Sequence, residues 1–241
     1  MKRALVTGAA RRIGRAIALE LAANQFEVAV HYHTSASQAL QTVASCKELG
    51  GQAFCVSADL TEPEECERLS HELQQRWSSL DLLVNNASRF QSTAFEDIGL
   101  EEWNRMLQLH ATAPFLLSQR LLPLLEAADD AVIVNLSDIG AKRPLSGYCH
   151  YSVSKAAGLM LTQAMAVELA PRVRCVGVNP GQVLWPEDFD PQLRQHITKR
   201  IPLGRVGTPQ EVAALVRFIA TEGTYLNGTI VDIDGGLSSR Y

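Results

Sequence analysis

The sequence predicts an α/β fold, a single domain built on a doubly wound parallel sheet, and three observations support this prediction. The 241 residues are a suitable length for one domain with a sizeable core. Short apolar runs alternate along the chain with longer segments of helical periodicity, without an internal repeat or linker. Most of these runs are continuously apolar, as is typical of parallel strands covered on both faces. This order predicts right-handed βαβ units throughout residues 1–241.

The expected elements follow from these patterns. The apolar runs predict strands at residues 4–7, 28–32, 53–58, 80–85, 131–136, 173–178 and 229–233. Helical periodicity predicts helices at residues 14–23, 36–49, 63–77, 101–125, 151–170 and 209–221. The longest irregular stretch covers residues 180–202, and we predict a substrate loop there because long loops in compact domains are often lids.

Composition and charge exclude several classes of function. Apolar residues make up 46% of the chain and charged residues 20%, and the formal net charge of −4 disfavours a nucleic-acid partner. No run of about 18 apolar residues occurs, so we expect no membrane span. The five cysteines show no spacing typical of a metal or redox site. We therefore expect no metal, and a reducing compartment such as the cytoplasm.

A glycine-bearing turn joins the first predicted strand to the first predicted helix. Gly8 allows the tight turn, and Gly14 allows close packing or a close approach of a ligand. The N-terminus of the following helix offers backbone N–H groups to a pyrophosphate. Strand, glycine turn and helix in this order predict a Rossmann-type dinucleotide site.

Tyr151 and Lys155 are the strongest candidates for catalysis. Their spacing places a phenol and an ammonium on one helix face, where the lysine is expected to lower the pKa of the tyrosine. Asp138 lies thirteen residues before Tyr151, and a carboxyl group in a partly desolvated cleft should have a raised pKa. The three side chains predict a proton relay beside a hydride transfer. The alternative for Tyr151 and Lys155 is a pair of surface residues on a helix. The alternative for Asp138 is a structural hydrogen-bond acceptor at the end of a strand.

Four positions that follow predicted strands should meet in one cleft. Gly8, Asn85, Asp138 and Pro180 each come at or just after the end of a strand. In an open α/β sheet, ligands bind beyond the carboxyl ends of the strands.

The end of the second predicted strand favours NADPH over NADH. His33, Thr34 and Ser35 include no acidic residue that would bind a ribose hydroxyl and reject a phosphate. Arg11 in the glycine turn can supply a charge-assisted contact to a 2′-phosphate, although a solvent-facing Arg11 is the alternative.

The chain resembles the short-chain dehydrogenases/reductases over essentially its whole length. The resemblance rests on Thr7-Gly8 with Gly14, Asn85-Asn86-Ala87, Tyr151 with Lys155, and Pro180-Gly181. It implies a homotetramer in which Arg240 reaches a neighbouring subunit's cleft. It also implies that the cofactor contacts are Gly8, Arg11, Arg12, Ile13, Gly14, His33, Thr34, Ser35, Asp59, Leu60, Asn86, Ala87, Tyr151, Lys155, Pro180 and Gly181. For Asp59, a helix N-cap is the alternative role.

Two departures from the family pattern resemble the pteridine reductases. Arg12 replaces the middle glycine of the turn, and Asp138 replaces the active-site serine. This resemblance implies that Arg12, Ser88, Phe90, Asp138 and Tyr151 contact the substrate, with Phe90 stacked on a flat pterin. The alternatives are that Arg12 braces the turn and that Phe90 packs in a loop.

A third departure is His110, which replaces the asparagine usual in the family. Its apolar neighbours favour a hydrogen-bonded structural histidine, and the resemblance implies that the change affects the choice of substrate.

The predicted function is NADPH-dependent reduction of a pterin or dihydrofolate-like ring. Tyr151 with Asp138 would protonate a ring nitrogen, and Lys155 would bind the ribose of the nicotinamide. One alternative is a carbonyl or 3-oxoacyl thioester reductase, although an anionic Asp138 would repel the developing oxyanion. The other is a non-catalytic NADPH-binding regulatory protein.

Overall fold

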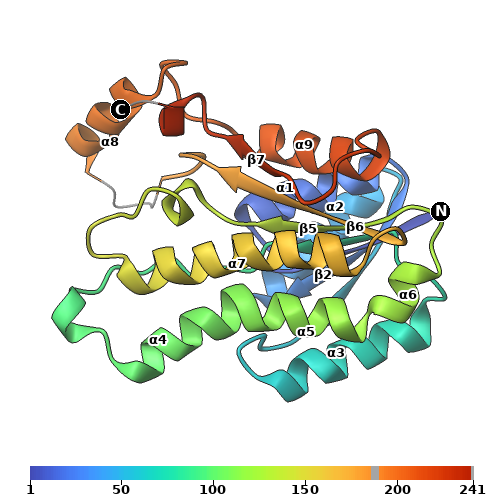
Figure 1. Ribbon diagram of the computed structural model, residues 1–241. Coiled ribbons are helices and arrows are strands. Elements are labelled where there is room, and N and C mark those ends of the chain that lie inside the picture. The colour runs from blue at the N-terminus through green and yellow to red at the C-terminus, as the bar shows by residue number, and fades with distance from the viewer. Residues whose placement is uncertain (186–189, 240–241) are drawn as a thin grey trace.

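The computed structural model describes residues 1–185 and 190–239, and its centre is a seven-stranded sheet (Figure 1). The strand order is β3-β2-β1-β4-β5-β6-β7, and every neighbouring pair is parallel. The strands are β1 (Lys2–Val6), β2 (Phe26–Tyr32), β3 (Gln52–Ser57), β4 (Leu82–Asn85), β5 (Ala131–Leu136), β6 (Val173–Pro180) and β7 (Ile230–Ile233). All seven predicted strands are confirmed, and so is the single α/β domain with a Rossmann-type sheet.

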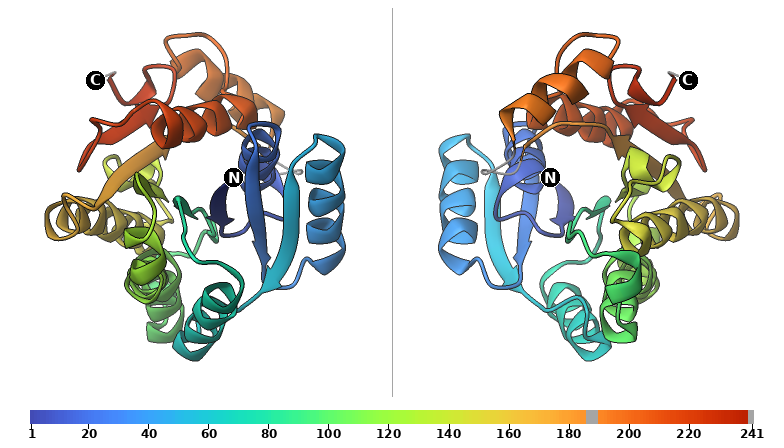
Figure 2. Two further views of the ribbon diagram at one scale, coloured as in Figure 1. Left: turned by 90° about the vertical axis from the view of Figure 1, so that its right-hand side faces the viewer. Right: turned by 90° about the vertical axis from the view of Figure 1, so that its left-hand side faces the viewer.

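Helices cover both faces of the sheet, as the continuous apolar strands require (Figure 2). One face packs against α1 (Arg12–Ala23), α2 (Ala36–Glu48) and α9 (Pro209–Thr221). The other packs against α3 (Pro63–Arg76), α5 (Ala113–Arg120) and α7 (Cys149–Glu168). Two apolar cores result, one on each side of the strands.

The predicted helix 101–125 is divided into four pieces. These are α4 (Leu100–Leu107), the π-helical turn η2 (Gln108–Thr112), α5 and α6 (Leu122–Glu126). Pro114 has no N–H to donate to the carbonyl of His110, and its ring would clash with that carbonyl in a regular α-helix. The widened turn therefore coincides with His110, and π-turns of this kind occur frequently at functional sites.

The predicted irregular stretch at 180–202 is wrong in its second half. Residues Pro191–Arg200 form α8, which begins with Pro191 at its first position. The Asp190 carboxylate accepts a hydrogen bond from the Gln192 N–H at 3.0 Å and so caps the helix. In Figure 1, α8 stands apart from the sheet, at the end of the molecule where the strands finish. Residues 186–189 and Arg240 lie outside the described residues.

Within the described ranges, no helix combines the length and apolar character needed to cross a membrane. Among the same residues, no three His, Cys, Asp or Glu side chains gather in a way that could hold a metal ion.

Candidate active site

The turns after β1 and β4 meet at the carboxyl edge of the sheet and are joined through Thr7. The Thr7 hydroxyl accepts hydrogen bonds from the backbone N–H groups of Asn86 at 2.8 Å and Ala87 at 2.9 Å. The Asn86 side chain donates to the Thr7 carbonyl at 2.7 Å. These bonds place Gly8 beside Ala87, as predicted for a shared cleft.

The glycine turn leaves no room for side chains at two positions. Gly8 has a φ of +64°, and a Cβ there would lie 3.0 Å from the Ala87 Cα. A Cβ on Gly14 would collide with the Gly8 carbonyl. The backbone can therefore approach a ligand closely, as a dinucleotide requires.

Arg12 occupies a strained position in this turn. Its φ of +55° lies in the left-handed region, which costs a non-glycine residue roughly 1–2 kcal/mol. The position explains why glycine is usual there. The side chain is exposed at the start of α1, so its guanidinium is accessible to a ligand.

His31 supports the turn from β2, a structural role that the sequence analysis did not assign to it. Its Nδ1 accepts a hydrogen bond from the Gly8 N–H at 3.0 Å, and its Nε2 lies 3.1 Å from the Ala58 carbonyl. Burial lowers the pKa of His31 to about 4, which keeps the ring neutral. A histidine in the mainly apolar run from residue 28 to residue 32 was the available signal.

The end of β2 carries exposed polar groups and no acidic side chain. His33 and Thr34 are exposed, Ser35 precedes α2, and Arg11 is exposed in the neighbouring turn. The His33 imidazole lies 3.4 Å from the Asp59 carboxylate, which follows β3.

Asp59 closes a local turn and does not cap a helix. Its carboxylate accepts hydrogen bonds from the Thr61 N–H at 2.9 Å and the Thr61 hydroxyl at 2.7 Å. Helix α3 begins four residues later with Glu62 at its N-cap, so the N-cap alternative for Asp59 is wrong. Leu60, between them, is buried.

Pro180 and Gly181 end β6 against β7. The Gly181 N–H donates to the Ile233 carbonyl at 3.0 Å, and a Cβ on Gly181 would lie 2.6 Å from the Asp234 Cβ. The glycine therefore permits the close approach of these two segments.

Tyr151 and Lys155 are both buried on α7. The Lys155 Nζ donates to the Leu136 carbonyl at 3.2 Å and lies 5.8 Å from the centre of the Tyr151 ring. Burial lowers the pKa of Lys155 to about 8. Asp138 follows β5, where its Oδ1 accepts a hydrogen bond from the Gly140 N–H at 2.6 Å. The structure thus brings the predicted catalytic residues together.

The expected effect of Lys155 on Tyr151 is wrong in this structure. The pKa of Tyr151 is raised well above its usual value, first by burial and then by the Asp138 carboxylate. The Lys155 ammonium, bonded to the Leu136 carbonyl, does not offset these effects. Burial also raises the pKa of Asp138, as predicted. Tyr151 therefore retains its proton at neutral pH.

An aromatic pair forms a wall beside Tyr151. Phe90 stacks on Tyr148 with ring centres 4.3 Å apart and planes at 15°, and its edge contacts Tyr151 at 5.0 Å. Phe90 is still 52% exposed, so part of the ring remains open to a ligand. Phe90 is therefore part of an aromatic cluster and not a lone loop residue.

His110 is buried, and its hydrogen bonds connect it to the site, a connection that the sequence analysis did not predict. Its Nε2 lies 3.0 Å from the Ser88 hydroxyl, and its Nδ1 lies 2.8 Å from the Ser154 hydroxyl. Its ring contacts Tyr151 edge to face, with centres 5.6 Å apart. The predicted hydrogen-bonded role is confirmed, and its partners are residues of the site.

Comparisons with known proteins agree with this geometry. The family model described as "Enoyl-(Acyl carrier protein) reductase" matches residues 8–238. A 3-oxoacyl-[acyl-carrier-protein] reductase of Synechocystis sp. is 35% identical over 238 residues, which cover 97% of this chain and 96% of the relative.

Two solved structures are similar over almost the whole chain. The angucycline C-6 ketoreductase LanV with bound NADP has a TM-score of 0.92 and 32% identity, covering 99% of this chain and 96% of that one. The reductase LugOII, described as catalysing keto-reduction at C1 during lugdunomycin biosynthesis, has a TM-score of 0.91 and 35% identity, covering 98% of each chain. These relatives match the carbonyl reductase alternative better than the predicted pterin reductase, since none of the three is described as acting on a pterin.

Proposed function

The chain belongs to the short-chain dehydrogenase/reductase family and is an oxidoreductase, and on this premise we propose that it reduces a carbonyl group with NADPH. The substrate class that we propose is a ketone such as the keto group of a 3-oxoacyl thioester. The names of the relatives above support this class.

The placement of the Tyr151 phenol on α7, buried and with the Lys155 Nζ 5.8 Å from its ring centre, is the observation that carries the proposal. Burial, the largest cause, raises the pKa of Tyr151 whether or not Asp138 is charged, so the O–H is retained at neutral pH. It can donate to a carbonyl oxygen and then transfer its proton as negative charge develops there. Lys155 is buried beside it and would bind the ribose hydroxyls of the cofactor.

Asp138 is compatible with a carbonyl substrate when it is neutral. Its raised pKa favours the protonated form, which has an O–H donor. Because Oδ1 accepts the Gly140 N–H, the proton of the neutral form would sit on Oδ2. A neutral carboxyl group could thus take the place of the family serine.

The residues of the glycine turn fit a dinucleotide phosphate. Gly8 and Gly14 leave the backbone open, and the first turn of α1 supplies N–H groups. The absence of an acidic residue at the end of β2 and the exposed Arg11 support NADPH, as does the NADP bound to LanV. When bound, NADPH supplies the hydride that reduces the carbonyl carbon.

A pterin-like ring is the second candidate substrate, because Asp138 and the Phe90–Tyr148 pair favour it. An ionised Asp138 could accept hydrogen bonds from ring N–H groups, and the exposed part of Phe90 could stack on a flat ring.

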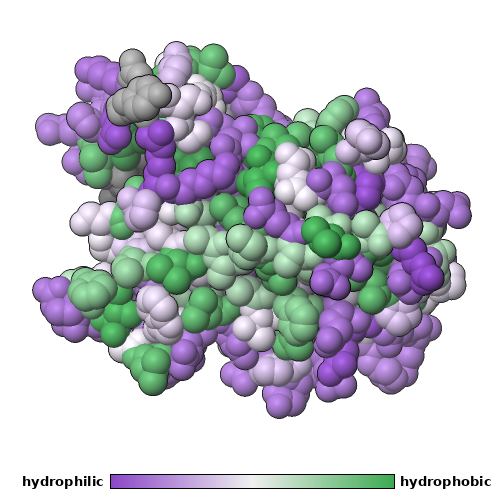
Figure 3. Space-filling view, in the orientation of Figure 1, coloured by the Kyte–Doolittle hydropathy of each residue, from purple (hydrophilic) through white to green (hydrophobic). Residues whose placement is uncertain are grey.

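A homotetramer built through the long helices is also part of the proposal. Figure 3 shows apolar side chains along the face formed by α7 and α5. Phe115, Val153, Met160 and Val167 on these helices are exposed. Symmetric association would bury them.

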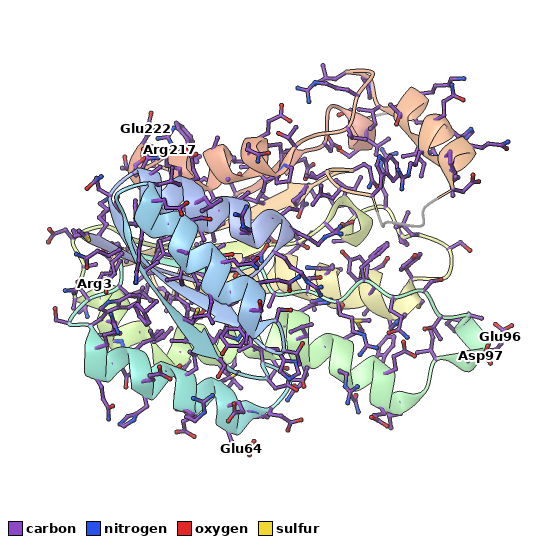
Figure 4. The ribbon with its side chains drawn as sticks, turned by 180° about the vertical axis from the view of Figure 1, so that it is seen from behind. Arg3, Glu64, Glu96, Asp97, Arg217 and Glu222 are labelled. Atoms are coloured by element: carbon purple, nitrogen blue, oxygen red, sulfur yellow. The ribbon has the colours of Figure 1, made fainter. Side chains whose placement is uncertain are left out.

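The charged groups labelled in Figure 4 lie away from this apolar face. Glu96 and Asp97 are at the tip before α4, and Arg217 and Glu222 are on the side of α9. Location in the cytoplasm stays a prediction.

A substrate panel tests the proposal. Oxidation of NADPH is followed with an acetoacetyl thioester, dihydromonapterin, dihydrobiopterin and dihydrofolate. We expect the highest kcat/KM for the keto substrate. Activity on a pterin without activity on the thioester would replace the first candidate with the second.

A further inference from the structure

Ser88, His110 and Ser154 form a chain of hydrogen bonds beside the Tyr151 phenol. The Ser88 hydroxyl lies 3.0 Å from His110 Nε2, and the Ser154 hydroxyl lies 2.8 Å from His110 Nδ1. The Ser154 hydroxyl also donates to the Tyr151 carbonyl at 2.7 Å. Ser88 additionally hydrogen-bonds to the Tyr151 side chain.

The neighbouring backbone fixes which nitrogen of His110 carries the proton. The Arg89 N–H points to Nε2 at 3.3 Å, and a backbone N–H can only donate. Nε2 is therefore an acceptor, and the proton is on Nδ1, from which it is donated to Ser154. Burial and the nearby charge of Lys155 lower the pKa of His110 well below its usual value, so the ring stays neutral.

This tautomer leaves the Ser88 O–H with two possible acceptors. One is Nε2 of His110, and the other is the phenolic oxygen of Tyr151. When the O–H turns to Tyr151, the Arg89 N–H still satisfies Nε2, so no buried acceptor is left without a partner. Burial and Asp138 raise the pKa of Tyr151, and the Ser88 hydrogen bond acts in the opposite direction by favouring the phenolate.

We propose that His110 is a positioning residue that orients Ser88, and that Ser88 donates a hydrogen bond to Tyr151 after Tyr151 gives its proton to the substrate. The proton moves from the Tyr151 oxygen to the substrate oxygen. The Ser88 O–H bond does not break, because the hydroxyl only turns from Nε2 to the phenolate. This inference rests on the proposed role of Tyr151 as proton donor.

The kinetic test uses Ser88→Ala, His110→Phe and the double variant. Ser88 is exposed, so Ser88→Ala should fold normally. We expect kcat to fall by about 10- to 100-fold in each single variant, with KM for NADPH nearly unchanged, as for loss of one hydrogen bond to a charged group. Because His110 acts through Ser88, the double variant should be no slower than the slower single variant.

Two further variants separate this role from packing. Ser88→Thr keeps a hydroxyl and should restore most of the activity. Ser118→Ala removes a buried hydroxyl that donates to the Pro114 carbonyl at 2.6 Å, away from Tyr151, and should leave kcat unchanged.

A measurement without cofactor or substrate tests the tautomer. In ¹⁵N spectra of the histidines, the signals lost in His110→Phe belong to His110. We expect a proton on Nδ1 and a bare Nε2 whose shift changes in Ser88→Ala. A proton on Nε2, an unchanged kcat in Ser88→Ala, or multiplying effects in the double variant would overturn the inference. If Tyr151→Phe itself kept full activity, the proposed function would fail instead.

Discussion

The two halves of the carboxyl edge of the sheet are built in different ways. Around β1, β2 and β3, the site consists of open backbone and exposed polar side chains, with Gly8 and Gly14 as the fixed points. Around β4, β5 and β6, it consists of buried side chains with shifted pKa values, above all Asp138, Tyr151 and Lys155. The first half provides shape for a ligand, and the second provides acid–base chemistry.

This difference predicts that substitutions in the second half affect turnover, whereas substitutions in the first affect binding and stability.

Removing the phenolic hydroxyl should have the largest effect. Tyr151→Phe keeps the ring and its contacts with Phe90 and His110. We expect turnover to fall by roughly 10²–10⁴-fold while NADPH binding persists, because a general acid is lost. Steady-state kinetics and titration of NADPH fluorescence measure the two effects. Near-normal turnover would show that Tyr151 is not the donor.

Asp138→Ser should separate the two candidate substrates. A serine can donate to a carbonyl oxygen but cannot offer a carboxylate to ring N–H groups. We expect thioester reduction to be kept or increased, and any pterin reduction to fall by about 10²-fold. The ratio of the two activities in the variant and the wild type is the measurement. Loss of both activities to the same degree would mean that Asp138 does not select the substrate.

His31 should make the first half of the site sensitive to acid. Its pKa is about 4 in the folded protein, below the usual 6.5, so the unfolded chain binds more protons between these values. The stability that the neutral His31 ring contributes is fully present above pH 6.5 and is lost as the pH falls toward 4. The free energy of unfolding should fall by about 3 kcal/mol over this range. His31→Gln should flatten this slope in denaturant unfolding, whereas replacing the exposed His33 should not. An unchanged slope would contradict the buried neutral ring.

Cofactor preference should show the smallest effect. We expect catalytic efficiency about tenfold higher with NADPH than with NADH, as for one charge-assisted contact. Arg11→Ala should reduce this preference, and Lys47→Ala, an exposed cation on α2, should not. Equal efficiencies in the wild type would argue against the phosphate contact.

The strands could be predicted from the sequence because burial on both faces of a parallel sheet leaves a continuous apolar run. The division of residues 101–125 could have been predicted from Pro114, although the helical periodicity continues through it. Helix α8 was missed because it has no buried residue and thus no apolar stripe. Its signals were Asp190-Pro191 at the start and basic residues at the end.

The motifs also predicted that Asp138, Tyr151 and Lys155 would be neighbours, but not how they affect one another. The balance between burial and charge that raises the Tyr151 pKa depends on three-dimensional distances. His110 lies in the π-helical turn η2 and contacts Ser88, which is 22 positions away in the sequence. No local sequence pattern predicts this contact.

The pH dependence of keto reduction tests most directly the claim that Tyr151 works beside a neutral Asp138. The measurement is kcat/KM for the acetoacetyl thioester from about pH 5 to about pH 9, in the wild type and in Asp138→Asn. We predict that wild-type activity falls as Asp138 ionises, at a pH above the usual value for an aspartate, and that Asp138→Asn lacks this decrease. Wild-type activity that instead rises as Asp138 ionises would contradict the account.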